Sequence, residues 1–375
     1  MRIQAIITEG KGSFVLDEVT LQPPQADEVL LEMKASGVCH TDYDCMCMWK
    51  DRAPRAEDFL RVGPRSSTYI MGHEGAGIVL QVGENVNHVK PGDRVLLNWA
   101  IPCGQCFQCL RSAENICENR RSLPDERFDW RGRKINTSFA LGTMATHALV
   151  PRQAVVKIDN EISFAEACIL GCAVMTGFGS VVNAAKVTPG STVVVLGCGG
   201  VGLSVIQGAV YCGATTILAV DIAAARLDMA MRFGATTTLL ADTADRGLQQ
   251  AALKVRSMTG GRGADYCFEC TAIPALGPAP LAFTRSGGTA VGVSGIEQSI
   301  PFDMELFEWD KTYLNPLYGQ CRPTRDFPLL LKLHSENRLK LREMVTRTYP
   351  LDGLSEAFSD MRAGRIAKGV LVMNA

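Results

Sequence analysis

Four cysteines in one short run have the spacing of a metal-binding loop. Cys103, Cys106, Cys109 and Cys117 stand in CGQCFQCLRSAENIC, a C-x2-C-x2-C-x7-C pattern. Four thiolates on short connections bind zinc tetrahedrally, with Zn–S bonds of about 2.3 Å, and leave no position for a substrate. We therefore predict a structural zinc site in a lobe at about residues 102–118. Four core cysteines or two disulfides are the alternative, although this density of cysteines is unusual in a core.

Three further residues form a candidate second metal site. Cys39 stands in GVCHTD, His73 in GHEG and Cys172 in GCAVMTG. Two thiolates and one imidazole leave the fourth position of a zinc ion open to water or substrate, which distinguishes a catalytic site from a structural one. The three residues are far apart in the chain, so only the fold can bring them together. Taken singly, each cysteine is more often a core residue.

A glycine-rich turn follows a strongly apolar segment. Gly197, Gly199 and Gly202 form G-x-G-x-x-G directly after residues 193–196. The first glycine permits a tight turn, the second lets the backbone approach a pyrophosphate, and the third allows close packing of helix and strand. Gly200 and Val201 open the following helix, whose N-terminus favours phosphates. The pattern predicts a dinucleotide site.

An acidic residue indicates which dinucleotide is bound. Asp221 ends the next predicted strand, 19 residues after Gly202, where a carboxylate can accept hydrogen bonds from both ribose hydroxyls. The same carboxylate repels a 2′-phosphate, so the position favours NAD over NADP. Arg226 complicates this prediction, because a guanidinium group can bind that phosphate. The alternative is that Asp221 only caps the following helix.

The apolar pattern predicts two domains of different architecture. Up to about Val150, short alternating apolar runs separated by Gly and Pro indicate a β-rich unit. From about Ser191, apolar strands alternate with helical stretches, which is typical of a parallel sheet covered by helices. From about Leu317 the chain returns to short mixed elements, which we expect to fold back onto the first unit. Residues 46–70 are predicted to form a surface excursion with a short helix at about 56–61.

Composition argues against nucleic acid and membranes as partners. The chain has 375 residues, of which 47% are hydrophobic and 21% charged, with a net charge of −1. This is enough for two cores, and no long run of like charge or of apolar residues stands out. A zinc-ribbon nucleic-acid module, the alternative for the cysteine loop, would need a basic face with aromatics. We therefore expect a small neutral ligand.

The N-terminal residues and the distribution of cysteines indicate the cellular compartment of the protein. The opening residues MRIQAIITEGKG lack the pattern of a secretory signal. The fourteen cysteines are spread over a large chain instead of forming the disulfide framework of a small secreted domain. We expect a soluble, cytoplasmic protein.

Taken together, the motifs resemble those of the zinc-dependent medium-chain alcohol dehydrogenases. GVCHTD, GHEGAG, VKPGDRV, the four-cysteine lobe, GCAVMTG, the glycine turn and Asp221 occur in that family's order over nearly the whole chain. The resemblance implies an α/β protein with a GroES-like β-rich catalytic domain at 1–173 and 317–375. It implies a Rossmann domain, with a doubly wound parallel sheet, at 174–316. Two zinc ions per chain, NAD and a homodimer are also implied.

The resemblance also implies roles for single residues. Cys39, His73 and Cys172 become ligands of a catalytic zinc, with Glu74 beside the metal as an occasional ligand or an electrostatic neighbour. Thr41 becomes the hydroxyl next to the bound alcohol.

Other positions in this resemblance concern the cofactor and the pocket. His40 and Lys368 are expected near the cofactor pyrophosphate, Thr176 near the nicotinamide and Arg226 near the adenosine ribose. Trp99 and Leu141, and also Phe128, are candidates for the wall of the substrate pocket.

The implied reaction is hydride transfer between NAD and a primary alcohol, with an aryl alcohol as one option, or the reverse reduction of an aldehyde. Asp44 stands where some family members have a relay histidine, and it either accepts a proton or is an ordinary loop residue. Arg120 and Arg121 keep open a second activity, oxidation of an S-(hydroxymethyl)glutathione-type adduct of formaldehyde. A catalytically silent zinc-binding relative is the third possibility, and it predicts a lost zinc ligand, whereas none is missing.

Overall fold

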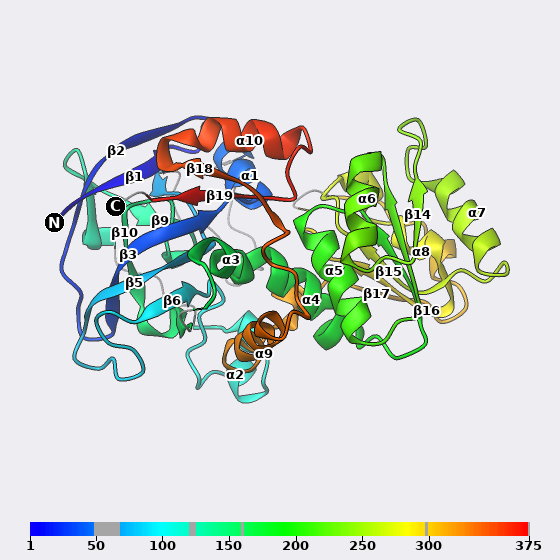
Figure 1. Ribbon diagram of the computed structural model, residues 1–375, viewed down its shortest axis with the longest axis horizontal. Helices are drawn as coiled ribbons and strands as arrows, with labels where there is room; N and C mark the ends of the chain where they lie inside the picture. The colour runs from blue at the N-terminus through cyan, green and yellow to red at the C-terminus, as the bar shows by residue number, and fades with distance from the viewer. Residues whose placement is uncertain (49–67, 120–124, 159–160, 297–298, 374–375) are drawn as a thin grey trace. The chain divides into compact units, whose positions relative to one another are not determined.

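The computed structural model describes residues 1–48, 68–119, 125–158, 161–296 and 299–373. The chain forms two compact units, one made of Met1–Cys172 with Arg322–Ala375 and the other of Ala173–Cys321 (Figure 1). The helix expected at 56–61, Arg120 and Arg121 all lie outside the described residues.

Two sheets make up the first unit. The first sheet has the strand order β8-β7-β2-β1-β4-β9. Its strands are β1 (Arg2–Thr8), β2 (Phe14–Leu21), β4 (Tyr69–Ile70), β7 (Phe128–Trp130), β8 (Arg133–Lys134) and β9 (Asn136–Thr137). The second sheet has the order β11-β6-β5-β3-β19-β18, and β10 also pairs with β3. Its strands are β3 (Glu28–Gly37), β5 (Gly75–Val82), β6 (Arg94–Leu97), β10 (His147–Pro151), β11 (Val155–Lys157), β18 (Val345–Pro350) and β19 (Lys368–Val372).

Alternation of apolar and polar residues explains why these strands form sheets with one buried face. In β1, every residue from Ala5 to Thr8 is buried, and Ile3 and Ile7 pack with Val19 of β2 in one apolar cluster. The helices of this unit are α1 (His40–Met48), α2 (Phe107–Leu110), α3 (Phe164–Ile169), α9 (Pro323–Ser335) and α10 (Leu354–Arg362). The last strand, β19, pairs with β3, so the second sheet combines strands from the first and last parts of this unit.

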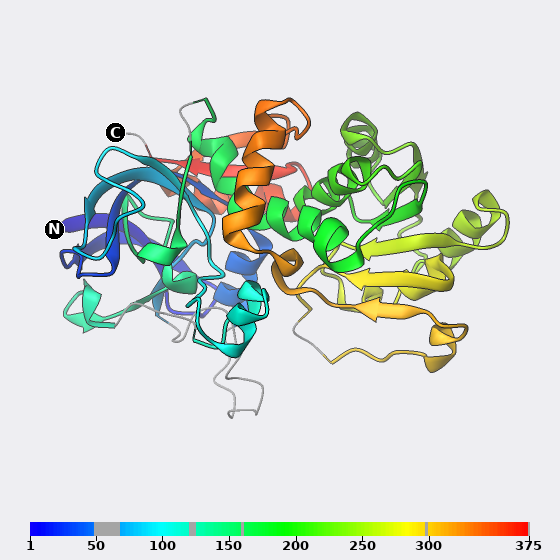
Figure 2. The same ribbon diagram turned by 90° about the horizontal axis from the view of Figure 1, so that it is seen from below.

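The second unit is a single parallel sheet with the order β14-β13-β12-β15-β16-β17. Its strands are β12 (Thr192–Leu196), β13 (Thr216–Asp221), β14 (Thr237–Leu240), β15 (Ala264–Glu269), β16 (Thr284–Gly292) and β17 (Thr312–Leu314). The helices are α4 (Met175–Gly179), α5 (Gly200–Tyr211), α6 (Ala224–Phe233), α7 (Gln249–Met258) and α8 (Pro280–Phe283). Figure 2 shows β15, β16 and β17, in yellow to orange, side by side.

The central strand β12 is apolar and buried from Val193 to Leu196, because helices cover both faces of the sheet. Val194, Leu196 and Leu218 face α7 and α8 in one core cluster, and α5 and α6 contact β12, β13 and β14 as well. The chain order reverses between β12 and β15, which defines the switch point where open α/β sheets bind ligands.

The unit boundaries differ slightly from those predicted. The second unit extends to Cys321, whereas the sequence analysis ended it at residue 316. The reason is a close backbone contact, since a Cβ on Gly179 would lie 2.6 Å from the carbonyl oxygen of Gly319. Only glycine permits this approach, and it fixes the turn at Leu317–Gln320 to the second unit.

One helical run, Phe164–Ala185, is long and apolar enough to cross a membrane by length and composition alone. Of its most apolar window, 78% is buried within the protein. A core helix of a soluble protein has the same properties, so this run is weak evidence for a membrane span.

Candidate active site

Residues from three separate parts of the first unit converge on one point. Cys39 follows β3, His73 and Glu74 lie immediately before β5, and Cys172 lies in the π-helical turn Leu170–Val174 after α3. One potential ligand atom from each of the four lies within 4.8 Å of the others. His73 and Glu74 are buried and the two cysteines are half-buried. The structure thus brings together the residues expected to bind a catalytic zinc.

This arrangement requires a glycine at position 37, because a side chain there would collide with Glu74. The amide of Gly37 donates a 2.8 Å hydrogen bond to the carbonyl of Glu74, which aligns the end of β3 with the start of β5. A Cβ at position 37 would lie 2.0 Å from Oε2 of Glu74. Any side chain there would displace the carboxylate from the cluster.

Asp42 orients the imidazole of His73, and the sequence analysis did not identify it. Its Oδ1 lies 3.0 Å from Nδ1 of His73, and both side chains are buried. Burial alone would lower the pKa of His73, but Asp42 and, to a smaller extent, Cys39 hold the pKa well above its ordinary value. Because Nδ1 is engaged, Nε2 is the nitrogen left for a metal. The sequence does contain a signal for Asp42, because this residue stands in GVCHTD, three residues after the predicted metal ligand Cys39.

The two thiols of the cluster share one proton. Cys172 donates a hydrogen bond to Cys39, which lowers the pKa of Cys39 well below its ordinary value and raises that of Cys172. Once zinc displaces that proton, two thiolates and an imidazole make up a donor set typical of zinc. The cluster therefore fits a zinc ion.

Glu74 lies at this cluster in a buried ion pair. Its Oε1 is 2.8 Å from Nζ of Lys368, which also donates to the carbonyl of Val38 at 3.0 Å. Burial raises the pKa of Glu74 to about 7, against the opposing effect of Lys368. Oε2 of Glu74 is buried and has no hydrogen-bond partner among the described residues, which is a further feature that a cation would satisfy. Lys368 was expected at the cofactor pyrophosphate, whereas here its ammonium group lies on Glu74.

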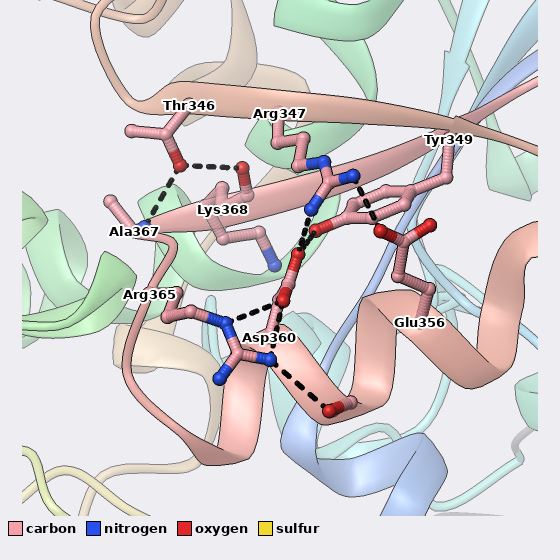
Figure 3. Close-up of polar contacts among 9 residues, drawn as sticks. Thr346, Arg347, Tyr349, Glu356, Asp360, Arg365, Ala367 and Lys368 are labelled. Atoms are coloured by element: carbon pink, nitrogen blue, oxygen red, sulfur yellow. Dashed lines mark hydrogen bonds and ion pairs between the residues drawn. The ribbon is translucent and has the colours of Figure 1, made fainter.

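A polar network anchors the segment that leads to Lys368 (Figure 3). Asp360 of α10 is buried and accepts hydrogen bonds from Tyr349 at 2.6 Å, Arg347 at 2.5 Å and Arg365 at 2.7 Å. The hydrogen bond from Tyr349, followed by that from Arg365, lowers the pKa of Asp360. The network joins α10 to β18 and to the loop before β19, and so it fixes the start of the strand that carries Lys368.

Three further candidate residues lie on α1: Thr41, expected next to the alcohol, Asp44, a candidate for the proton relay, and His40, expected near the cofactor pyrophosphate. Thr41 is half-buried in its first turn, His40 is exposed, and Asp44 is half-buried one turn further on. Thr41 is two residues from Cys39, so its hydroxyl is on the segment that carries a metal ligand.

The candidate pocket residues have different environments. Trp99 is half-buried, and its ring lies 5.4 Å from that of Phe139. Leu141 is fully buried in the core of the second sheet, and Phe128 is buried in the core of the first. Both are packing residues, so we remove Leu141 and Phe128 from the proposed pocket. They were misassigned because an apolar residue in a loop does not reveal whether it faces a core or a cavity.

The four cysteines of the lobe form a second cluster. One Sγ from each of Cys103, Cys106, Cys109 and Cys117 lies within 4.8 Å of the others. Backbone amides point at the sulfurs, with Cys106 N at 3.3 Å from Cys103 Sγ and Cys109 N at 3.4 Å from Cys106 Sγ. Burial alone would raise the pKa of Cys106, but amide donors lower it to about 6. All four are free thiols, and such a set fits a structural zinc.

The glycine turn in the second unit has the three expected properties. Gly197 has a φ of 88°, a Cβ on Gly199 would meet no atom within 4 Å, and one on Gly202 would lie 1.9 Å from the carbonyl oxygen of Gly197. The turn therefore needs glycine for its conformation and for helix packing, and it leaves open space where a phosphate would approach. Gly200 and Val201 form the first residues of α5.

Asp221 ends β13 beside this turn. It accepts hydrogen bonds from the amides of Cys198 at 2.8 Å and Ala223 at 3.0 Å. Its carboxylate thus orders the turn itself. Arg226 lies 3.7 Å from it and is half-buried, so a guanidinium group is present beside the proposed ribose position. Thr176 is half-buried in α4.

Comparison with known proteins identifies two family models in the chain. Residues 25–160 match the alcohol dehydrogenase GroES-like domain, and residues 200–336 match the zinc-binding dehydrogenase domain. The chain is 34% identical to putative alcohol dehydrogenase D of Mycobacterium tuberculosis, with 98% of both chains covered. It is 33% identical to alcohol dehydrogenase class-3 of Myxine glutinosa, covering 98% of this chain and 96% of the relative.

Solved structures give the same result. Benzyl alcohol dehydrogenase from Acinetobacter calcoaceticus matches with a TM-score of 0.84 and 29% identity over the whole of both chains. An alcohol dehydrogenase zinc-binding domain protein from Burkholderia ambifaria matches with a TM-score of 0.85, also at 29% identity over both whole chains.

Proposed function

The chain belongs to the zinc-dependent medium-chain alcohol dehydrogenase family of oxidoreductases, and we propose that it transfers hydride between NAD and a primary alcohol, with an aryl alcohol as one option. The observation that carries this proposal is the cluster of Cys39, His73 and Cys172, with Glu74 held beside it by Lys368. A zinc ion there would supply Lewis acidity at the alcohol oxygen, and NAD would supply the hydride acceptor.

The chain's own residues have separate tasks in this reaction. Asp42 fixes the imidazole of His73, so that one nitrogen faces the cluster. Thr41 is proposed to accept the hydroxyl proton of the alcohol and to pass it outward. Asp44 is a half-buried carboxylate one turn further along α1, and it is proposed as the next acceptor.

Two features support NAD and two zinc ions per chain. Asp221 presents a buried carboxylate at the end of β13, next to the glycine turn, where a 2′-phosphate would be repelled. The four cysteines of the lobe form a closed set that is separate from the first cluster. We further propose a homodimer, by analogy with the family, and a cytoplasmic location, which the fourteen free thiols support.

Metal analysis and steady-state assays test the proposal. The purified protein should contain two zinc ions per chain, and Cys39→Ala should retain one and lose activity. Reduction of NAD should be followed with benzyl alcohol, with aliphatic alcohols, and with formaldehyde in the presence and absence of glutathione. A strict requirement for glutathione would favour the thiol-adduct dehydrogenase. Retention of both zinc ions with no oxidation of any alcohol would indicate the silent relative.

A further inference from the structure

Glu269 is a buried carboxylate at the end of the parallel sheet where the glycine turn lies. It ends β15, the strand that pairs with β12, and the residue is 0% exposed. Its Oε1 accepts hydrogen bonds from the amide of Thr271, at 2.6 Å, and from the hydroxyl of the same residue. Oε2 has no hydrogen-bond partner among the described residues. A buried oxygen of this kind is costly, so its presence at this position calls for an explanation.

Thr271 links this carboxylate to the glycine turn. A Cβ on Gly197 would lie 2.7 Å from Cγ2 of Thr271, so the threonine methyl group packs directly on the first glycine. The amide of Cys270 donates a 2.8 Å hydrogen bond to the carbonyl of Leu196, which joins the ends of β15 and β12. Glu269 therefore holds Thr271 against the turn, and a charge on Glu269 is separated from the turn by one side chain.

Glu269 is the group of its cluster whose charge changes with pH. Burial raises its pKa, and the strongest opposing groups are neutral hydrogen-bond donors, foremost Thr271, instead of cations. Its titratable neighbours are the thiols of Cys267 and Cys270 and the phenol of Tyr313 on β17. Burial first, and then Glu269, raises the pKa of each thiol well above its ordinary value and that of Tyr313 to about 12. These three neighbours therefore stay neutral near pH 7.

We propose that Glu269 is a positioning residue for the dinucleotide, and that its ionised form weakens binding of the pyrophosphate at the glycine turn. This inference rests on the proposed function. The neutral acid keeps a carbonyl oxygen that accepts from Thr271, so it holds the turn in place. The ionised acid holds the turn as well, but it repels the phosphates in a medium of low dielectric constant. By linkage, the affinity for the dinucleotide should fall as the pH rises.

The test is calorimetric binding of ADP-ribose, which contains the pyrophosphate and lacks the redox-active ring. The dissociation constant is measured between pH 6 and pH 9 for the unmodified enzyme and two variants. Glu269→Gln keeps an oxygen for Thr271 and removes the charge. Asp265→Asn is the matched control, because Asp265 lies at the other end of β15 and is paired with Arg285 at 2.7 Å. We expect the unmodified enzyme and the control to lose affinity about fivefold or more as the pH rises, the lower range of coupling between sites, and Glu269→Gln to remove this dependence.

Proton uptake supplies a measurement that needs no variant. Calorimetry of ADP-ribose binding in two buffers of different ionisation enthalpy, across the same pH range, counts the protons taken up. We expect uptake of a fraction of one proton per chain. Binding without proton uptake, or a pH dependence that Glu269→Gln leaves unchanged, would overturn the inference. If the unmodified enzyme binds no ADP-ribose at any pH, the dinucleotide site itself is absent, and the proposed function fails together with the inference.

Discussion

Replacing Lys368 by methionine should destabilise the protein strongly, because it leaves a buried carboxylate without its counter-ion. Nζ of Lys368 and Oε1 of Glu74 are 2.8 Å apart, and the two residues are 5% and 0% exposed. At an effective dielectric constant of about 20, their attraction is about 6 kcal/mol before desolvation is subtracted. Removal of one partner of a buried pair typically costs about 3–5 kcal/mol. We expect a loss in this range.

The assay is urea denaturation of the zinc-depleted protein, because zinc binds the native state and adds to its apparent stability. Tryptophan fluorescence reports on this unit, which contains Trp99 and Trp130. Lys157→Met is a matched control. Nζ of Lys157 also lies 2.8 Å from a carboxylate, that of Asp93, but its side chain is 56% exposed. A surface pair contributes about 0–1 kcal/mol.

The double variant Glu74→Leu with Lys368→Met separates the charge from the packing. Removing both charges should recover most of the lost stability, since replacement of a buried pair by apolar residues is often neutral. If Lys368→Met lowers the free energy of unfolding by no more than Lys157→Met, the buried ion pair does not stabilise the protein as inferred here.

Three other perturbations have defined outcomes. Cys106→Ser should leave one zinc ion per chain and lower the melting temperature, and two ions by metal analysis would contradict a zinc in the lobe. Asp221→Ser should raise KM for NAD about tenfold or more, as expected for lost charged hydrogen bonds, and should improve the use of NADP through Arg226; an unchanged cofactor preference would count against the ribose role. For Glu166, burial alone would raise the pKa, but hydrogen bonds from Ser163 and Arg342 hold it below its ordinary value of 4.5. The contribution of Glu166 to the free energy of unfolding is therefore present above pH 4.5 and is lost as the pH falls further. Glu166→Gln keeps the capping hydrogen bond and removes the charge, so it should cost up to about 1 kcal/mol at pH 7, the contribution of an ion pair with the exposed Arg342. The difference in stability from the parent protein should disappear in acid denaturation profiles. If the two proteins still differ in stability at low pH, the charge of Glu166 is not the cause of the difference.

Features set by local sterics could be predicted from the sequence. Gly197 has a positive φ and Gly202 has no room for a Cβ, so the structure gives a conformational reason for the first and a steric reason for the second, whereas the space beside Gly199 is open. The alternation of strands and helices from Ser191 onward likewise predicted the parallel sheet, because helix and strand periodicities are local properties of a chain.

Contacts between distant segments could not be predicted in this way. Lys368 and Glu74 are 294 residues apart, and nothing near either residue indicates their pairing. The orientation of Phe139 depends on two left-handed residues that are not glycine, so the sequence contains no turn signal there. Asp42 is a different case, because a carboxylate close to a predicted metal ligand is a common partner of a ligating histidine.

The pairing of β19 with β3 has a consequence for biosynthesis. Val370, Leu371 and Val372 complete the sheet edge formed by Gly37, Ser36 and Ala35. A ribosome therefore finishes the whole parallel-sheet unit before it makes the strand that the first unit still lacks. Until then, β3 has an unpaired backbone edge of the kind that promotes aggregation. Folding of the first unit thus depends on the strand Lys368–Val372, and a nascent chain stopped before that strand would be a client for chaperones.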